Sequence, residues 1–122
     1  METKEIAQLL VERTEIKSEE RAKEIIIAFL KTLGERVSKT EQENFADQLP
    51  TDLADLVLAD TSTERYTLDA FYKRFGSRCD LKVDDSIKYT QECGQIAKEF
   101  ISVGKIADIL KELPNEYEEI FA

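Results

Sequence analysis

The sequence predicts an all-α protein, a compact bundle of about eight helices formed by two tandem four-helix repeats. Apolar residues recur three or four positions apart along most of the 122 residues, which is the spacing of amphipathic helices. Only four Gly and two Pro occur, which favours helices with short turns over a strand-rich sandwich. No segment shows the sustained alternation of apolar and polar residues that is typical of strands.

The first expected helix runs roughly from Lys4 to Arg13, and its apolar face carries Ile6, Leu9 and Leu10. Ser18 is a suitable N-cap for the second helix, because its hydroxyl can accept from a free backbone N–H. Glu19 and Glu20 follow in the first turn, where the helix dipole favours acids. The second helix should be the most buried of its half, since its apolar stripe is the longest: Ala22, Ile25, Ile26, Phe29, Leu30, Leu33 and Val37.

The segment 38–41 reads Ser-Lys-Thr-Glu, which has the form of a capping box and starts a third helix that ends near Leu49. Pro50 suits the first turn of a short fourth helix, which carries Leu53, Leu56 and Val57. Polar residues follow. We therefore expect one domain, 1–122, with repeats at about 4–60 and 66–122 and a linker at 60–66.

Thr67 is expected to cap a fifth helix, and a sixth helix over about 84–102 repeats the central role of the second. Pro114 separates a seventh helix from an eighth. The apolar stripes of these four helices are Leu68, Phe71, Tyr72 and Phe75; Ile87, Thr90, Cys93, Ala97, Phe100 and Ile101; Ile106, Ile109, Leu110 and Leu113; and Tyr117, Ile120 and Phe121.

The second half repeats the pattern of the first at low identity. Leu-Pro at 49–50 recurs 64 residues later at 113–114, and one single-residue gap changes the offset to 65 nearer the start. Equivalent positions include Phe45 and Ile109, Phe29 and Cys93, Arg13 and Arg78, and Glu19–Glu20 and Asp84–Asp85. This self-similarity predicts an internal duplication.

The central helix beginning Arg21-Ala22, the segment Phe45-Ala46-Asp47-Gln48-Leu49-Pro50 and the acidic–apolar helix after it resemble the bacterial family known as domain of unknown function 2267. Members of that family look like paired helical repeats, each ending in a Gln-Leu-Pro or related Leu-Pro signature. The resemblance covers about Ile6 to Phe121, with Glu112 in place of the second glutamine. A polar linker replaces the aromatic, glycine-rich link expected between the repeats. The resemblance implies a fold and brings no activity, substrate or catalytic residue.

The composition excludes several classes of function. Histidine is absent, so there is no Ser-His-Asp or Cys-His catalytic unit and no His-containing zinc site. The net charge of −9 argues against nucleic acid as a partner, because affinity for phosphate depends on Lys and Arg. No run approaches the length of a membrane span. The polar N-terminus shows no signal peptide, so we expect a cytoplasmic protein that does not act at a membrane.

Several candidate sites have a functional and a structural interpretation. The Leu-Pro motifs could be recognition corners or simply helix starts. Cys79 and Cys93 could form a redox pair, or Cys93 could be a small core hydrophobe. The carboxylate clusters could bind a metal, but adjacent acids on a helix do not converge on one ion, so we expect no metal and no cofactor. The clusters are Glu19–Glu20, Asp84–Asp85 and Glu116, Glu118 and Glu119.

A cluster of basic residues and three tyrosines mark the fifth and sixth helices. Lys73, Arg74, Arg78 and Lys82 could form a local anion site, or they could pair with nearby acids at helical spacing. Tyrosine offers a large contact area at low entropic cost, which favours interfaces. The side of these helices bearing Tyr66, Tyr72 and Tyr89 is therefore the candidate partner surface, and the alternative is tyrosines at the core margin with wet hydroxyls.

These observations favour a non-catalytic module that works through protein–protein contact. The partner is a protein that the sequence does not identify, and a homodimer is possible. The alternative is a small-molecule or metal-dependent enzyme whose site lies at the seam between the two repeats. Converging polar groups in a pocket at that seam would favour the enzyme, and a shallow apolar groove would favour the module.

Overall fold

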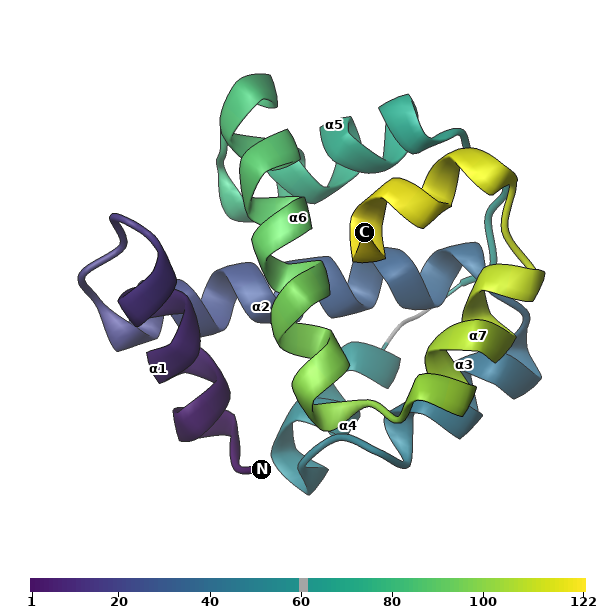
Figure 1. The fold of residues 1–122 in the computed structure, drawn as a ribbon, viewed down its shortest axis with the longest axis horizontal. Coiled ribbons are helices and arrows are strands. Elements are labelled where there is room, and N and C mark those ends of the chain that lie inside the picture. The colour runs from purple at the N-terminus through teal and green to yellow at the C-terminus, as the bar shows by residue number, and fades with distance from the viewer. Residues whose placement is uncertain (60–61) are drawn as a thin grey trace.

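The computed structural model describes residues 1–59 and 62–122. Its elements are α1 (Thr3–Arg13), α2 (Glu19–Arg36), α3 (Lys39–Ala46), α4 (Thr51–Leu58), α5 (Leu68–Cys79), α6 (Val83–Phe100), α7 (Val103–Lys111) and a short 3₁₀ helix, η1 (Asn115–Phe121). Figure 1 shows their arrangement. The described residues contain no strand, so the all-α prediction is confirmed. Of the expected linker, residues 60 and 61 lie outside the described residues, and residues 62–66 are not helical.

The helix starts follow the predicted cap residues. The hydroxyls of Ser18, Ser38 and Thr67 each accept a hydrogen bond from the backbone N–H three residues later. Two features differ from expectation. The third helix ends at Ala46 instead of near Leu49. The last helix is a 3₁₀ helix, and its first hydrogen bond runs from the Tyr117 N–H to the Pro114 carbonyl (3.0 Å).

The two long helices, α2 and α6, lie at the centre of the molecule, and each is contacted by elements of both halves (Figure 1). Helix α1 packs on α2 and on α6, and α5 packs on α6 and on α2. Helix α4 lies on α2, η1 lies on α6, and α3 meets α7. Exchanging α1 with α5, α2 with α6, α3 with α7 and α4 with η1 maps most of these helix contacts onto one another.

The hydrophobic core contains side chains from both halves. The buried ring of Phe29 makes edge contacts with Phe71 and Phe75, with ring centres 6.1 and 6.2 Å apart. Tyr117 meets Phe71 in the same geometry at 5.9 Å. Because aromatic side chains bury much area and prefer such edge contacts, the contacts of Phe29 tie the first half to the second, and the contact of Tyr117 with Phe71 lies within the second half.

The halves also exchange helix caps. The Ser38 N–H and hydroxyl donate to the Glu112 carboxylate (2.7 and 3.0 Å), so Glu112 makes the bond that the predicted capping box assigns to Glu41. At positions 64 residues away, the Ser102 N–H donates to the Gln48 side-chain oxygen (2.7 Å). The residue before each Leu-Pro pair thus caps a helix of the other half. No helix in the described part of the chain is long and apolar enough to cross a bilayer.

Candidate functional site

The tyrosines of the candidate partner surface are mostly buried. Tyr72 and Tyr89 are only 6 % and 7 % exposed, so they offer little area for contact with a partner. Tyr66 is half-buried, and its hydroxyl donates to the Thr32 carbonyl (2.6 Å). Burial is the main cause that raises the pKa of all three phenols. Carboxylates distant in sequence raise these pKa values further. Glu116 and Glu119 of the last segment act on Tyr72, and Glu15 acts on Tyr89.

The two thiols are buried and free. Burial raises the pKa of Cys79 to about 11 and the pKa of Cys93 well above its usual value. The Cys79 thiol donates to the Phe75 carbonyl (3.2 Å). Because the thiolate is the reactive form, this environment favours the interpretation of both cysteines as core residues.

The carboxylate clusters serve the helix ends. Glu19–Glu20 and Asp84–Asp85 occupy the first turns of α2 and α6. Glu116 accepts from the Leu68 N–H at the start of α5 (3.1 Å). No group of three or more acids or cysteines among the described residues could hold a metal ion.

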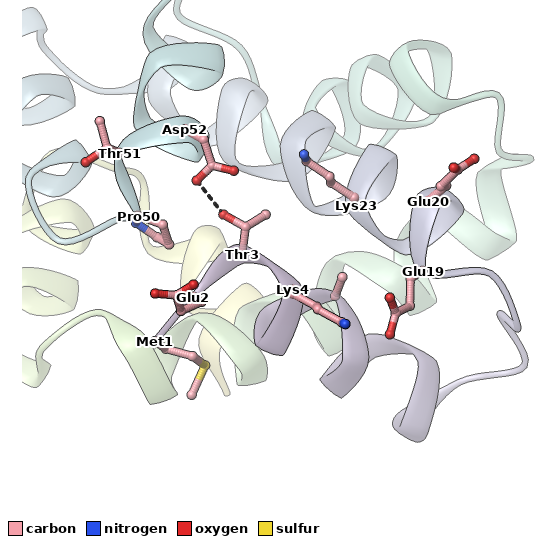
Figure 2. Close-up of a pocket in the computed structure, with 11 residues that line it drawn as sticks. Met1, Glu2, Thr3, Lys4, Glu19, Glu20, Lys23, Pro50, Thr51 and Asp52 are labelled. Carbon is pink, nitrogen blue, oxygen red and sulfur yellow. Dashed lines mark hydrogen bonds between the residues drawn. The ribbon is translucent and has the colours of Figure 1, made fainter.

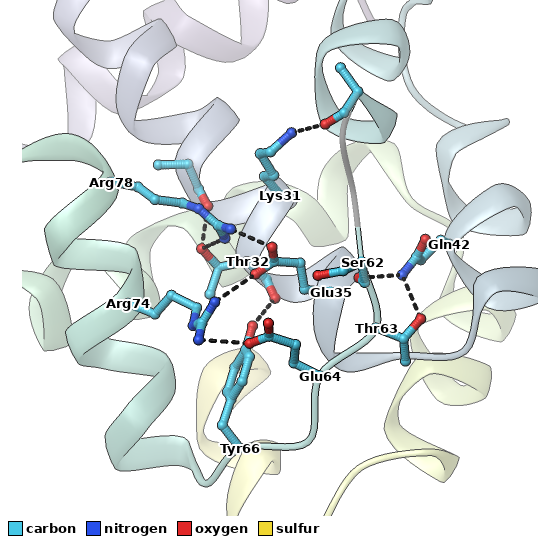
Figure 3. Close-up of polar contacts among 12 residues, drawn as sticks. Lys31, Thr32, Glu35, Gln42, Ser62, Thr63, Glu64, Tyr66, Arg74 and Arg78 are labelled. Carbon is cyan, nitrogen blue, oxygen red and sulfur yellow. Dashed lines mark hydrogen bonds and ion pairs between the residues drawn. The ribbon is translucent and has the colours of Figure 1, made fainter.

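The basic cluster splits between two roles. Lys73 pairs with Asp69 at i,i+4 (3.1 Å), as the surface interpretation expects. Arg74 and Arg78 instead reach α2 of the first half, where Figure 3 shows both side chains extending from α5 towards the buried Glu35. Glu35 was not predicted from the sequence, and its position between Leu33 and Val37 on a buried stripe is the one signal for it.

Glu35 links three segments. Its carboxylate lies 2.5 Å from Arg78 Nη2 and 3.6 Å from Arg74 Nη1. Arg78 also donates to the Thr32 hydroxyl (2.8 Å), and Arg74 pairs with Glu64 of the segment before α5 (2.7 Å). Since each charge has a partner of opposite sign, this network fastens the two halves together and leaves little charge free for a ligand.

A cavity of about 720 Å³ lies between the starts of α1, α2 and α4. Figure 2 shows the residues that line it, and we call it the acidic cavity because its charged side chains are four carboxylates and two amines. These are Glu2, Glu19, Glu20, Asp52, Lys4 and Lys23. The sequence analysis explained Glu19 and Glu20 by the helix dipole and did not foresee that three helix starts would meet.

The negative charge of the acidic cavity is only partly balanced, because four carboxylates lie with two amines. No ion pair within 4 Å joins any of these six side chains to another described residue. The Thr3 hydroxyl donates to Asp52 (2.8 Å), which lowers the pKa of Asp52, and nearby Lys23 adds to the effect. Asp52 therefore stays ionised at neutral pH and is unsuited to act as a general acid. The arrangement can attract and hold a cation.

A second cavity, of about 510 Å³, lies where the end of α2 and the start of α3 meet the linker and the end of α7. We call it the seam cavity. Its polar side chains are Arg36, Ser38, Thr63, Arg65 and Glu112, and Val37 and Pro114 complete its wall. The cavity lies where the two halves of the chain meet, and polar side chains of both halves line it.

The sequence model of a family described as uncharacterized conserved protein (DUF2267) matches residues 3–120. No curated protein matches the chain.

Proposed function

Because the chain belongs to this family of uncharacterised conserved proteins, and membership assigns no activity, we propose from the geometry that it is a non-catalytic protein-interaction module of the bacterial cytoplasm. The acidic cavity is its binding surface. The partner presents lysine or arginine side chains, which balance the excess of carboxylates over amines in the cavity.

One observation carries this proposal: the carboxylates of the acidic cavity have no ion-pair partners among the described residues. At the contacts between the halves, by contrast, Glu35, Glu41 and Glu99 each lie within 4 Å of a Lys or Arg. An open concave site with a surplus of negative charge steers a basic partner towards it and selects against acidic ones. The tyrosine surface contributes less than expected, since of its three residues only Tyr66 has appreciable exposed area.

The proposal is tested by affinity capture from the native cytoplasm with the full chain as bait. In the variant Glu19→Gln/Glu20→Gln the acidic cavity loses two charges, and we expect capture of the basic partner to be lost. Capture by the unaltered chain should also weaken as salt is raised, because the attraction is screened.

The equivalent positions in the second half supply a matched control. Asp84→Asn/Asp85→Asn removes two acids from the first turn of α6, so the helix-dipole effect is similar while the acidic cavity is untouched. Capture that falls equally with both double variants would contradict the proposal, as would recovery of a second copy of the chain alone.

The second candidate function is a small-molecule enzyme at the seam. The seam cavity favours it, because polar groups of both repeats converge there. Different variants test the two candidates. Changes at Glu19 and Glu20 should weaken partner binding at the acidic cavity, and changes at Arg36 and Arg65 should weaken small-molecule binding at the seam cavity.

A further inference from the structure

We propose that the seam cavity binds a small molecule carrying a singly charged oxyanion, a carboxylate or a phosphodiester, between Arg36 and Arg65. This site is separate from the acidic cavity and does not depend on the interaction module, and it names the ligand class for the second candidate function proposed above.

The two arginines of the seam cavity are the ones that lack a carboxylate partner. Of the six arginines in the chain, four have a carboxylate within 4 Å: Arg13, Arg21, Arg74 and Arg78. Arg36 and Arg65 have none among the described residues, and both line the same cavity. The chain has nine more negative than positive charges. Two arginines without a carboxylate partner at the seam cavity are therefore unexpected unless an anion binds between them.

Arg36 is held in place without being neutralised. Its Nε donates to the Tyr66 carbonyl (2.8 Å), and its guanidinium carbon lies 5.4 Å from the centre of the Tyr117 ring. The buried Tyr117 is itself fixed, because its hydroxyl donates to the same carbonyl (2.6 Å). A carbonyl and a ring orient the guanidinium but leave its full positive charge, so the group is ready for an oxyanion at little entropic cost.

The charge balance selects the ligand class. Arg36 and Arg65 bring two positive charges, and the Glu112 carboxylate brings one negative charge that is held by the Ser38 N–H and hydroxyl. One positive charge remains, which a monoanion neutralises and a dianion exceeds. Two oxygens of a carboxylate or phosphodiester match the fork of a guanidinium.

The remaining wall suits a small organic molecule. Val37 and Pro114 offer apolar surface for its body, and Ser38 and Thr63 also line the cavity. A volume of about 510 Å³ lies within the usual range for small-molecule sites. The net charge of −9 on the whole chain repels a long polyanion such as nucleic acid.

The test is an NMR titration of the full chain labelled with the isotope ¹⁵N. Each probe anion replaces an equal amount of chloride, so the ionic strength stays constant. Acetate and dimethyl phosphate are the two probes. We expect saturable shifts of the backbone amides of Val37, Ser38, Thr63 and Arg65. Saturation by acetate alone identifies the ligand group as a carboxylate, and saturation by dimethyl phosphate alone identifies it as a phosphodiester.

Three variants sharpen the result. Arg65→Gln should weaken binding about tenfold, since it removes a charged hydrogen-bond donor. Arg65 is exposed, so this change leaves the core intact. Glu112→Gln should tighten binding several-fold, because it removes the opposing charge while its amide oxygen still caps Ser38, as Gln48 caps Ser102. Arg21→Gln, which removes a positive charge elsewhere, should leave the affinity unchanged.

Shifts that do not saturate, or equal affinity in the unaltered chain and Arg65→Gln, would overturn the proposal. So would weaker binding in Glu112→Gln. Inorganic phosphate at a pH where it is a dianion should bind less tightly than either probe, and tighter binding would refute the single-charge assignment.

Discussion

Two Arg–Glu ion pairs lie at equivalent positions of the two halves, one of them buried and the other near the surface. Arg78 pairs with Glu35 and Arg13 pairs with Glu99, each at 2.5 Å, and the four residues occupy equivalent positions of the two halves. The side chain of Glu35 is 6 % exposed, whereas that of Glu99 is 39 % exposed. Burial determines what each pair is worth, because removing one partner of a buried pair leaves a charge that water cannot solvate.

We therefore expect Arg78→Ala to lower the free energy of unfolding by about 2 kcal/mol, with Arg74 compensating part of the loss at Glu35. Arg13→Ala should cost less than about 1 kcal/mol, as exposed pairs do. Chemical denaturation of both variants measures the difference. Adding Glu35→Leu to Arg78→Ala should recover stability, since no buried charge then remains. Equal losses in the two single variants would show that burial is not the deciding factor.

At the scale of elements, close packing of η1 on α6 depends on a glycine. A Cβ built at Gly94 would lie 1.8 Å from the Ile120 carbonyl oxygen, a backbone atom that cannot move aside alone. A Cβ built at Gly104, in the first turn of α7, meets nothing within 4 Å. The same chemical change therefore has opposite consequences in two helices.

Gly94→Ala should destabilise the protein by about 3 kcal/mol and displace η1, because the contact is overpacked. Gly104→Ala should stabilise it by about 0.5 to 1 kcal/mol through helix propensity alone. Thermal unfolding measures both, and hydrogen exchange of the η1 amides should accelerate only in Gly94→Ala. A neutral Gly94→Ala variant with unchanged η1 exchange would contradict this packing.

At the scale of the whole molecule, neither half closes its own core. Phe29 packs against Phe71 and Phe75 of the other half, and the caps at Ser38 and Ser102 are completed across the seam. Helices α3 and α7 meet with Glu41 3.3 Å from Lys105, two residues at equivalent positions. Two copies of one half would place like charges there, so unlike halves pair better than like halves.

We expect the fragments 1–61 and 62–122 to be largely unfolded alone and to regain helix when mixed in equimolar amounts. Separation exposes the aromatic contacts between the halves, and mixing restores them. Circular dichroism measures the helix content, and light scattering shows whether one fragment pairs with itself. A fragment that folds fully as a monomer would contradict the shared core.

Local chemistry alone was enough to predict the helices, their caps and most of the core. Ser18, Ser38 and Thr67 cap the helices that their positions predicted, because a cap needs only a hydroxyl and an N–H three residues away. Helical spacing likewise identified Ile25, Phe29 and Leu33 as buried, since the period of the helix fixes which residues share a face.

The candidate sites were decided by contacts between segments far apart in the chain. Tyr72 and Tyr89 are buried, and Glu35 is neutralised, through residues of distant elements. The acidic cavity exists because three helix starts meet, and the seam cavity because the end of α2 and the start of α3 lie beside the linker and the end of α7. Helix periodicity describes one helix at a time, and only packing brings such groups within interaction distance of one another.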